Sequence, residues 1–89
     1  MRSLGKNRTD RNGLKQGYWE YYYENGNIMS KGYYKNDKAD GMWEDYYPNG
    51  NLECKGLYKD NEMDGYWDFY NPDAGIGNRR LYDNGDLII

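Results

Sequence analysis

The chain is built on a repeat of 24 residues. Residues 17–40 align with residues 41–64 without a gap, and 13 of the 24 positions are identical. A third copy, residues 65–89, opens with the same Gly-x-Trp sequence as the other two. A fixed period of this length is typical of architectures in which each unit is one supersecondary element stacked on its neighbours. We therefore expect one repeat domain over residues 17–89.

Both ends of this repeat domain depart from its pattern. The third copy has Ala74 and Arg80 where the second has Gly50 and Gly56, as expected of a terminal capping unit. The segment before the first copy, residues 1–16, carries five basic residues and one acidic residue. Its last part aligns with the linkers between copies, so we interpret this basic N-terminal segment as the remnant of an earlier copy.

Each copy has the sequence pattern of a β-hairpin. In the first copy, two stretches rich in aromatic and apolar residues, 19–23 and 28–34, are separated by Asn25-Gly26. Asn-Gly favours the tight type I′ turn, in which these are the two central residues. The cross-strand pairs predicted from that turn are Trp19 with Gly32, Glu20 with Lys31, and Tyr23 with Ile28.

The same register places an acidic residue opposite a basic one in every copy. The second copy pairs Glu44 with Lys55, and the third pairs Asp68 with Arg79. Exposed pairs of this kind contribute only about 0.2 to 1 kcal/mol each, so they specify the register more than they stabilise the sheet.

The predicted register also places an indole over a glycine. Trp19 faces Gly32, and the second copy repeats the pair. An indole that covers a bare glycine in a strand fills the space left by the missing side chain. In the third copy Arg80 faces Trp67, and we expect the guanidinium to lie on the indole as a cation–π contact.

Short polar linkers join the copies. A four-residue turn over residues 37–40 pairs Tyr34 with Trp43 and keeps the tryptophans of all three copies on one face of an antiparallel meander. We therefore predict an all-β fold, a single-layer twisted sheet of three repeated hairpins, residues 17–40, 41–64 and 65–89. The candidate partner-binding residues on its aromatic face are Trp19, Tyr21, Tyr34, Trp43, Tyr47, Trp67 and Phe69.

The recurring pattern Gly-x-Trp-x-x-Tyr-Tyr-x-Asn-Gly, followed by Gly-x-Tyr, resembles the MORN-repeat variant family over residues 17–85. The resemblance implies an elongated single-layer β-sheet of successive hairpins. Many bacterial proteins of this variant are described as antitoxin-like, and the classical relatives as membrane-associated or protein-binding scaffolds. The resemblance brings no catalytic residue to this chain.

Charge is distributed unevenly along the sequence. Residues 1–16 have a net charge of +4, whereas residues 17–89 carry seven basic and fourteen acidic residues, a net charge of −7. Nucleic-acid binding requires clustered cations, so the repeat body is a poor candidate for it, and the same objection applies to anionic membranes. An acidic body suits a partner with a basic surface, because opposite charges speed the encounter.

Residues that carry catalysis or bind metals are scarce. The chain has no histidine, which removes the commonest general base and the commonest metal ligand. The segment 60–65 imitates the start of a calcium loop, but the twelfth position is Asn71 instead of glutamate. Cys54 is the single cysteine, which favours a reducing compartment and a cytoplasmic location. We predict no enzyme activity, no cofactor and no metal.

The sequence therefore predicts a non-catalytic protein-binding module, and the resemblance implies a bacterial or phage type. In the leading hypothesis the chain is an antitoxin-like or inhibitory protein that sequesters a partner enzyme through its aromatic sheet face and acidic surface. Two alternatives stay open at this point: a self-associating structural protein or scaffold, and sequestration of a small ligand such as a nucleotide in a cleft between protomers, since aromatic side chains stack on nucleobases.

Overall fold

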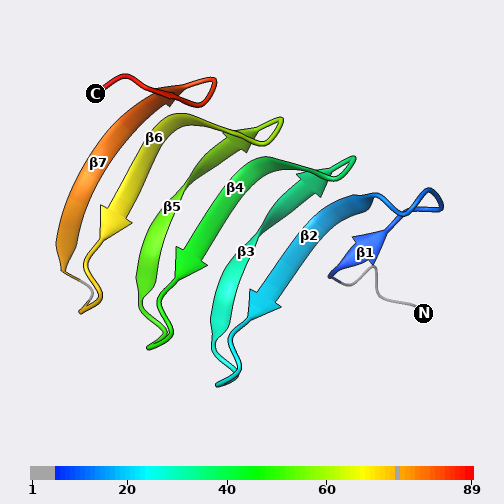
Figure 1. Ribbon diagram of the computed structural model, residues 1–89, viewed down its shortest axis with the longest axis horizontal. Coiled ribbons are helices and arrows are strands. Elements are labelled where there is room, and N and C mark those ends of the chain that lie inside the picture. Colours follow the sequence, from blue (N-terminus) through cyan, green and yellow to red (C-terminus); the bar gives the residue numbers. More distant parts are fainter. Residues whose placement is uncertain (1–5, 74) are drawn as a thin grey trace.

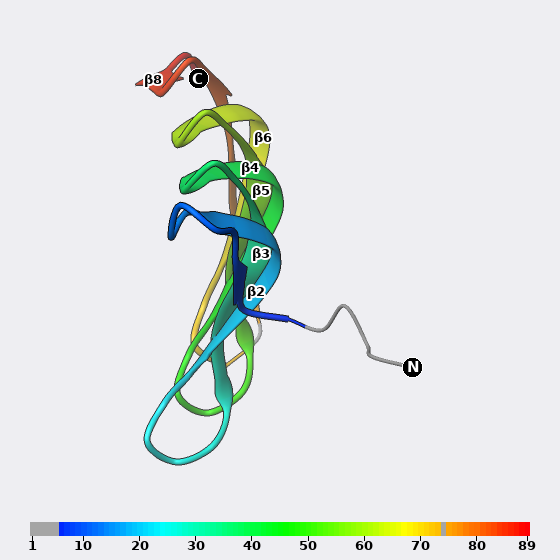
Figure 2. The same ribbon diagram turned by 90° about the vertical axis from the view of Figure 1, so that its right-hand side faces the viewer.

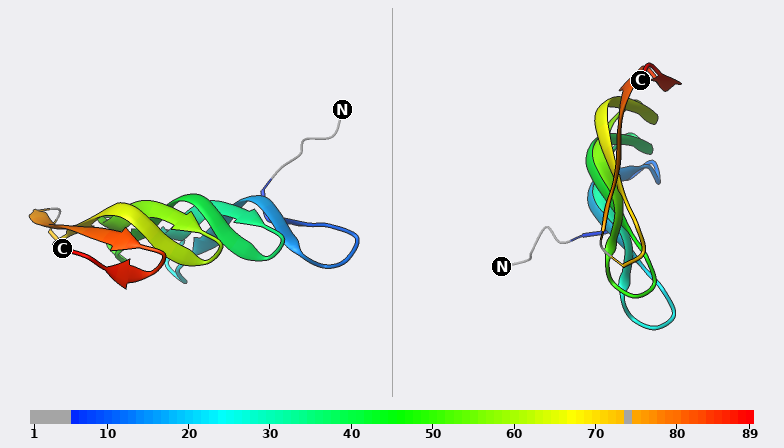
Figure 3. Two further views of the ribbon diagram at one scale, coloured as in Figure 1. Left: turned by 90° about the horizontal axis from the view of Figure 1, so that it is seen from above. Right: turned by 90° about the vertical axis from the view of Figure 1, so that its left-hand side faces the viewer.

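The computed structural model describes residues 6–73 and 75–89, and these residues form one antiparallel sheet with neighbouring strands in chain order (Figure 1). The predicted all-β meander is confirmed. The sheet is a single twisted layer that measures 41 × 33 × 20 Å (Figure 3). The strands are β1 (Arg8–Thr9), β2 (Lys15–Tyr22), β3 (Ile28–Lys35), β4 (Lys38–Tyr46), β5 (Leu52–Lys59), β6 (Glu62–Tyr70), β7 (Ile76–Asp83) and β8 (Asp86–Leu87).

The loop within each hairpin is longer than predicted. Tyr23 N donates to Asn27 O at 2.8 Å, and Gly26 N donates to Tyr23 O at 3.0 Å, so the pair of Tyr23 with Asn27 closes a loop of three residues, 24–26. Gly26 has a φ of 91°, whereas Asn25 is not in the left-handed region that a type I′ turn requires. The two-residue turn is therefore wrong. In the longer loop, Asn25 and Asn27 both donate side-chain hydrogen bonds to Pro48 O of the next copy.

The extra loop residue is compensated within the hairpin. Tyr22 pairs with Ile28, so the predicted pair of Tyr23 with Ile28 is wrong. A bulge at the next rung restores the register that the sequence predicts, with Trp19 opposite Gly32 and Glu20 opposite Lys31. The second copy has the same pattern, with Asp45 opposite Cys54, and it confirms Trp43 opposite Gly56 and Glu44 opposite Lys55. The third copy confirms Asp68 opposite Arg79.

The linkers between hairpins are the tight turns. Asn36 and Asp37 have φ values of 51° and 72°, as a two-residue type I′ turn requires, and Asn and Asp tolerate this conformation better than most residues. Tyr34 pairs with Ala39, so the predicted four-residue turn and the rung of Tyr34 with Trp43 are wrong. The turns Asp60-Asn61 and Asn84-Gly85 have the same geometry.

These turns curl back over the preceding copy (Figure 2). Asp37 N donates to Lys15 O at 3.0 Å, and Asn61 N donates to Ala39 O at 2.8 Å. An irregularity in the pairing of β3 with β4 allows the curl, and Gly41 of β4 has a φ of 114°. The curled ends lie over the tryptophan face, because Ala39 packs in the core with Trp43.

The core consists of the few side chains enclosed on that face: Ala39, Trp43, Cys54 and Trp67. A Cβ built on Gly32 would lie 2.1 Å from the Trp43 ring, and one on Gly56 would lie 2.3 Å from the Trp67 ring. The predicted cover of Gly32 by Trp19 is therefore wrong: each indole leans over the glycine of the preceding copy. The reason is a hydrogen bond, since Trp43 Nε1 donates to Tyr33 O at 2.9 Å.

The two ends of the sheet pack differently. β1 pairs with the start of β2, and Trp19 Nε1 donates to Arg8 O at 3.1 Å. The interpretation of residues 1–16 as a remnant copy stays a prediction, and residues 1–5 lie outside the described residues. At the other end, Arg80 lies 4.8 Å from the ring centroid of Phe69, not on Trp67 as expected. Ala74 also lies outside the described residues.

Candidate protein-interaction surface

Aromatic rings form a continuous row across strands β2 to β6. Tyr34 stands between Trp19 and Trp43, with ring centroids 5.7 and 5.0 Å away. Tyr58 stands in the same way between Trp43 and Trp67, at 6.2 and 4.9 Å. All four contacts are edge-on, the geometry that aromatic quadrupoles favour. We call these five rings the aromatic row.

The structure brings most of the predicted surface residues together on this face. Trp43 and Trp67 are only 6% and 1% exposed, so their indoles serve mainly the sheet's own core. Tyr47 stands apart, because its hydroxyl donates to Tyr70 O at the loop end of the sheet. The remaining predicted residues are half-buried and lie along the row: Trp19, Tyr21, Tyr34 and Phe69.

Sequence reasoning missed two members of this face, Tyr58 and Tyr82, which pack against the core. The signal was present, since each follows Tyr34 by a whole number of 24-residue periods. Burial raises the pKa of both Tyr34 and Tyr58, so these two hydroxyls keep their protons. The hydroxyls of Tyr21 and Tyr34 lie 3.0 Å apart and share a hydrogen bond. The face therefore presents neutral hydroxyls among apolar rings.

The opposite face carries four exposed large apolar side chains, one from each of the strands β3 to β6. Tyr33, Met42, Leu57 and Tyr66 are 45 to 56% exposed. Met42 pairs with Leu57 and Tyr33 pairs with Tyr18, so the side chains of neighbouring strands line up. We call the set of Tyr33, Met42, Leu57 and Tyr66 the exposed row.

A row of alternating charges runs beside the exposed row. Its members, in order across the sheet, are Glu20, Lys31, Glu44, Lys55, Asp68 and Arg79. Lys31 Nζ lies 3.4 Å from Glu44 of the next hairpin, and Arg79 Nε lies 2.7 Å from Asp68. Lys31 thus links two adjacent hairpins, and Arg79 links the two strands of the third hairpin.

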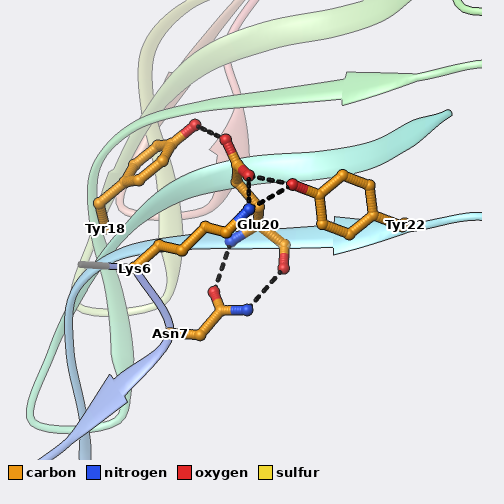
Figure 4. Close-up of polar contacts among 5 residues, drawn as sticks. All are labelled: Lys6, Asn7, Tyr18, Glu20 and Tyr22. Atoms are coloured by element: carbon orange, nitrogen blue, oxygen red, sulfur yellow. Dashed lines mark hydrogen bonds and ion pairs between the residues drawn. The ribbon is translucent and has the colours of Figure 1, made fainter. Parts of the chain in front are cut away.

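Glu20 begins this charge row and is bound by the N-terminal segment (Figure 4). Lys6 Nζ lies 2.7 Å from its carboxylate, and the hydroxyls of Tyr18 and Tyr22 also donate to it. The Asn7 side chain accepts from Glu20 N at 2.8 Å and donates to Glu20 O at 3.2 Å. This amide supplies the donor and acceptor that a neighbouring strand would offer to the edge of β2.

The Glu20 cluster predicts acid sensitivity. Hydrogen bonds from Lys6, Tyr18 and Tyr22 lower the pKa of Glu20 from 4.5 to about 2. Because the pKa is lower in the folded state, the stabilisation is complete above pH 4.5 and is lost as the pH falls towards 2. As the pH falls from 4.5 towards 2, the melting temperature of the Glu20→Gln variant should fall by less than that of the parent protein. Glu24→Gln, an exposed carboxylate of the same hairpin, should behave like the parent; equal acid sensitivity in all three proteins would contradict the assignment.

The described residues hold little that suggests catalysis. They contain no cluster of three or more His, Cys, Asp or Glu side chains that would hold a metal ion. Burial, with the nearby Asp45 carboxylate, raises the pKa of Cys54 to about 12, so its thiol stays protonated. None of the described residues forms a helix able to cross a membrane.

The fold and its surfaces define a β-hairpin repeat protein with an open sheet and two accessible faces. Residues 15–36 and 39–60 match the family model described as MORN repeat variant, so these two segments of the chain are similar to that repeat. MORN repeats are non-enzymatic modules that generally bind proteins or membranes. No curated protein matches the chain.

Proposed function

We propose that this chain is a non-catalytic protein-binding module that sequesters a partner enzyme, in the manner of an antitoxin or inhibitor. The observation that carries the proposal is the aromatic row. Its tyrosines and Trp19 remain half-exposed on a face that the curled linkers shape into a shallow depression, bordered by Ala39 and Asn61. Tyrosine and tryptophan are enriched at interface hot spots because they bury much area and keep a polar group.

Charge indicates the kind of partner. The repeat body has a net charge of −7, so a protein with a basic surface is attracted to it, whereas nucleic acids and anionic membranes are repelled. Enzymes that act on nucleic acids commonly have basic surfaces, which makes this class the best fit for an inhibitor. The bacterial or phage origin and the cytoplasmic location expected from the sequence remain predictions.

The proposal predicts a face-specific loss of binding. We expect a tagged chain to recover a stoichiometric partner from a bacterial lysate, and Trp19→Ala to reduce the recovery about tenfold or more, as for a truncated hot spot. Mass spectrometry of the eluate identifies the partner. The matched control is Met42→Ala, which removes an apolar side chain from the opposite face and should leave recovery unchanged.

Two results would overturn the proposal. Recovery of no protein by a correctly folded chain would remove the binding role, and equal recovery by Trp19→Ala and the parent would remove the aromatic face as the site. If a partner is recovered, its activity measured with and without the chain tests the sequestering role directly.

Self-association is a second candidate function, and the exposed row favours it. Four apolar side chains lie beside a row of alternating charges, and such a row can complement a second copy related by a twofold axis. In that case the mass measured by light scattering should rise with concentration. Leu57→Lys should keep the protein monomeric, because it places charge in the centre of the exposed row.

A further inference from the structure

Near Trp43, two positions on the tryptophan face differ from their equivalents 24 residues earlier and 24 residues later. Asp45 stands where the first and third copies have Tyr21 and Phe69. Ala39 stands where the chain has Lys15 one period earlier and Met63 one period later. In the flanking copies the larger ring packs beside its tryptophan, with centroids 5.9 Å apart in the first copy and 6.5 Å in the third. The middle copy lacks this ring, so the space beside Trp43 is open.

The open space is a notch with aromatic sides. The Trp43 indole lies over Gly32 and forms the floor. Tyr34 and Tyr58 stand nearly perpendicular to the indole, at 79° and 89°, and form two walls. The notch has a volume of about 340 Å³ and is completed by Ser30, Ala39, Asp45 and Asn61.

The notch contains a carboxylate without a cationic partner. Asp45 accepts hydrogen bonds from Ser30 Oγ at 2.6 Å and Cys54 Sγ at 3.5 Å, and both donors are neutral. The ion pairs formed among the described residues all involve other carboxylates. A negative charge among aromatic faces attracts cations in two ways, through the charge itself and through the ring quadrupoles.

The neighbouring positions on this face are already occupied by cations of the chain itself. Lys15 Nζ lies 5.7 Å from the ring centroid of Trp19 and 5.4 Å from that of Tyr34. Arg80 lies over Phe69 in the third copy. One period after Lys15 the equivalent position is Ala39, which is too short to fill the notch. The aromatic face therefore accepts cations at both ends and leaves its central position open.

We propose that this notch binds the guanidinium group of an arginine presented by the partner protein. A planar guanidinium stacks on aromatic rings and donates hydrogen bonds to a carboxylate in a fixed fork, and the notch offers both. The inference rests on the protein-binding role proposed above and names the chemistry of the contact. It also agrees with the basic surface expected of the partner.

The indole N–H signals of the three tryptophans provide the test. N-acetyl-arginine amide is titrated into the ¹⁵N-labelled protein up to roughly 50 mM, because a single side chain binds weakly. We expect the Trp43 indole signal to shift with saturation, while those of Trp19 and Trp67 move little. The uncharged citrulline analogue should produce no shift, and the lysine analogue should bind several-fold more weakly, since an ammonium lacks the planar fork.

Three variants make the test specific. Asp45→Asn keeps the size of the side chain and removes its charge, and should weaken binding about tenfold. Asp45→Phe restores the ring of the flanking copies and should abolish binding in a protein that still folds. Glu44→Gln makes the same change of net charge on the opposite face and should bind like the parent.

The proposal is overturned by any of three results: no saturable shift of the Trp43 signal, equal binding by Asp45→Asn and the parent, or equal binding of the citrulline analogue. Because the probe is a small molecule, these results leave the partner recovery experiment unaffected. Failure of the notch and failure of the protein-binding role can therefore be distinguished.

Discussion

Replacement of Gly56 by alanine should destabilise the protein by about 3 kcal/mol or more. An alanine Cβ at this position would lie 2.3 Å from the Trp67 ring, which is 1% exposed and cannot move without opening the core. The backbone of Gly56 lies outside the left-handed region, so an alanine there would otherwise be expected to stabilise the strand slightly. The sign of the effect therefore reports the steric contact. Urea unfolding followed by circular dichroism measures it.

Arg80 provides the matched control for this substitution. It occupies the position equivalent to Gly56 in the third copy, where no further tryptophan follows. Arg80→Ala should therefore change the free energy of unfolding by less than about 1 kcal/mol. A Gly56→Ala protein as stable as the parent would show that the indole does not lie over this glycine.

The contact between glycine and tryptophan also distinguishes the third copy from the first two. Gly32 and Gly56 each lie under the indole of the following copy, so a glycine at this position lets the next copy pack against the sheet. The third copy has Arg80 instead, and its side chain lies over Phe69. The same substitution that marks the third copy as divergent in sequence removes the glycine on which an indole docks in the first two copies.

The sequence predicts the fold and most of the register, because these depend on a repeated pattern. Opposite charges at the same rung of each hairpin, such as Glu20 and Lys31, identify the pairing without knowledge of the loops. The turn types are not predictable in this way. Asn25 favours a type I′ turn within its own hairpin, but in the structure its side chain bonds to Pro48 of the next copy. A contact between copies overrides the local preference.

The candidate surface, like the fold, is predictable from the sequence only in part. The period places the tryptophans on one face, and Tyr34 with Trp43 remains on that face although the rung between them is wrong. Burial is not predictable from the period, since it depends on how far the linkers curl. The notch depends on the differences between copies at Asp45 and Ala39, and these become meaningful only when the neighbouring rings are placed.

The three tryptophans should differ strongly in their contribution to stability. Trp67→Ala should cost about 3 to 5 kcal/mol, the range for a large buried ring, and leave little folded protein. Trp19→Ala should cost only about 1 to 2 kcal/mol, because Trp19 is half-buried at the end of the aromatic row. Urea unfolding of both variants, followed by circular dichroism, gives the comparison.

This difference decides which aromatic residues can report on function. Loss of binding by Trp67→Ala would follow from loss of the fold, whereas Trp19→Ala should remain folded and report on the surface itself. Equal destabilisation by the two substitutions would contradict the burial difference, and it would mean that β1 encloses Trp19 as tightly as the third copy encloses Trp67. In that case half-buried tyrosines such as Tyr34 would become the better probes of the aromatic face.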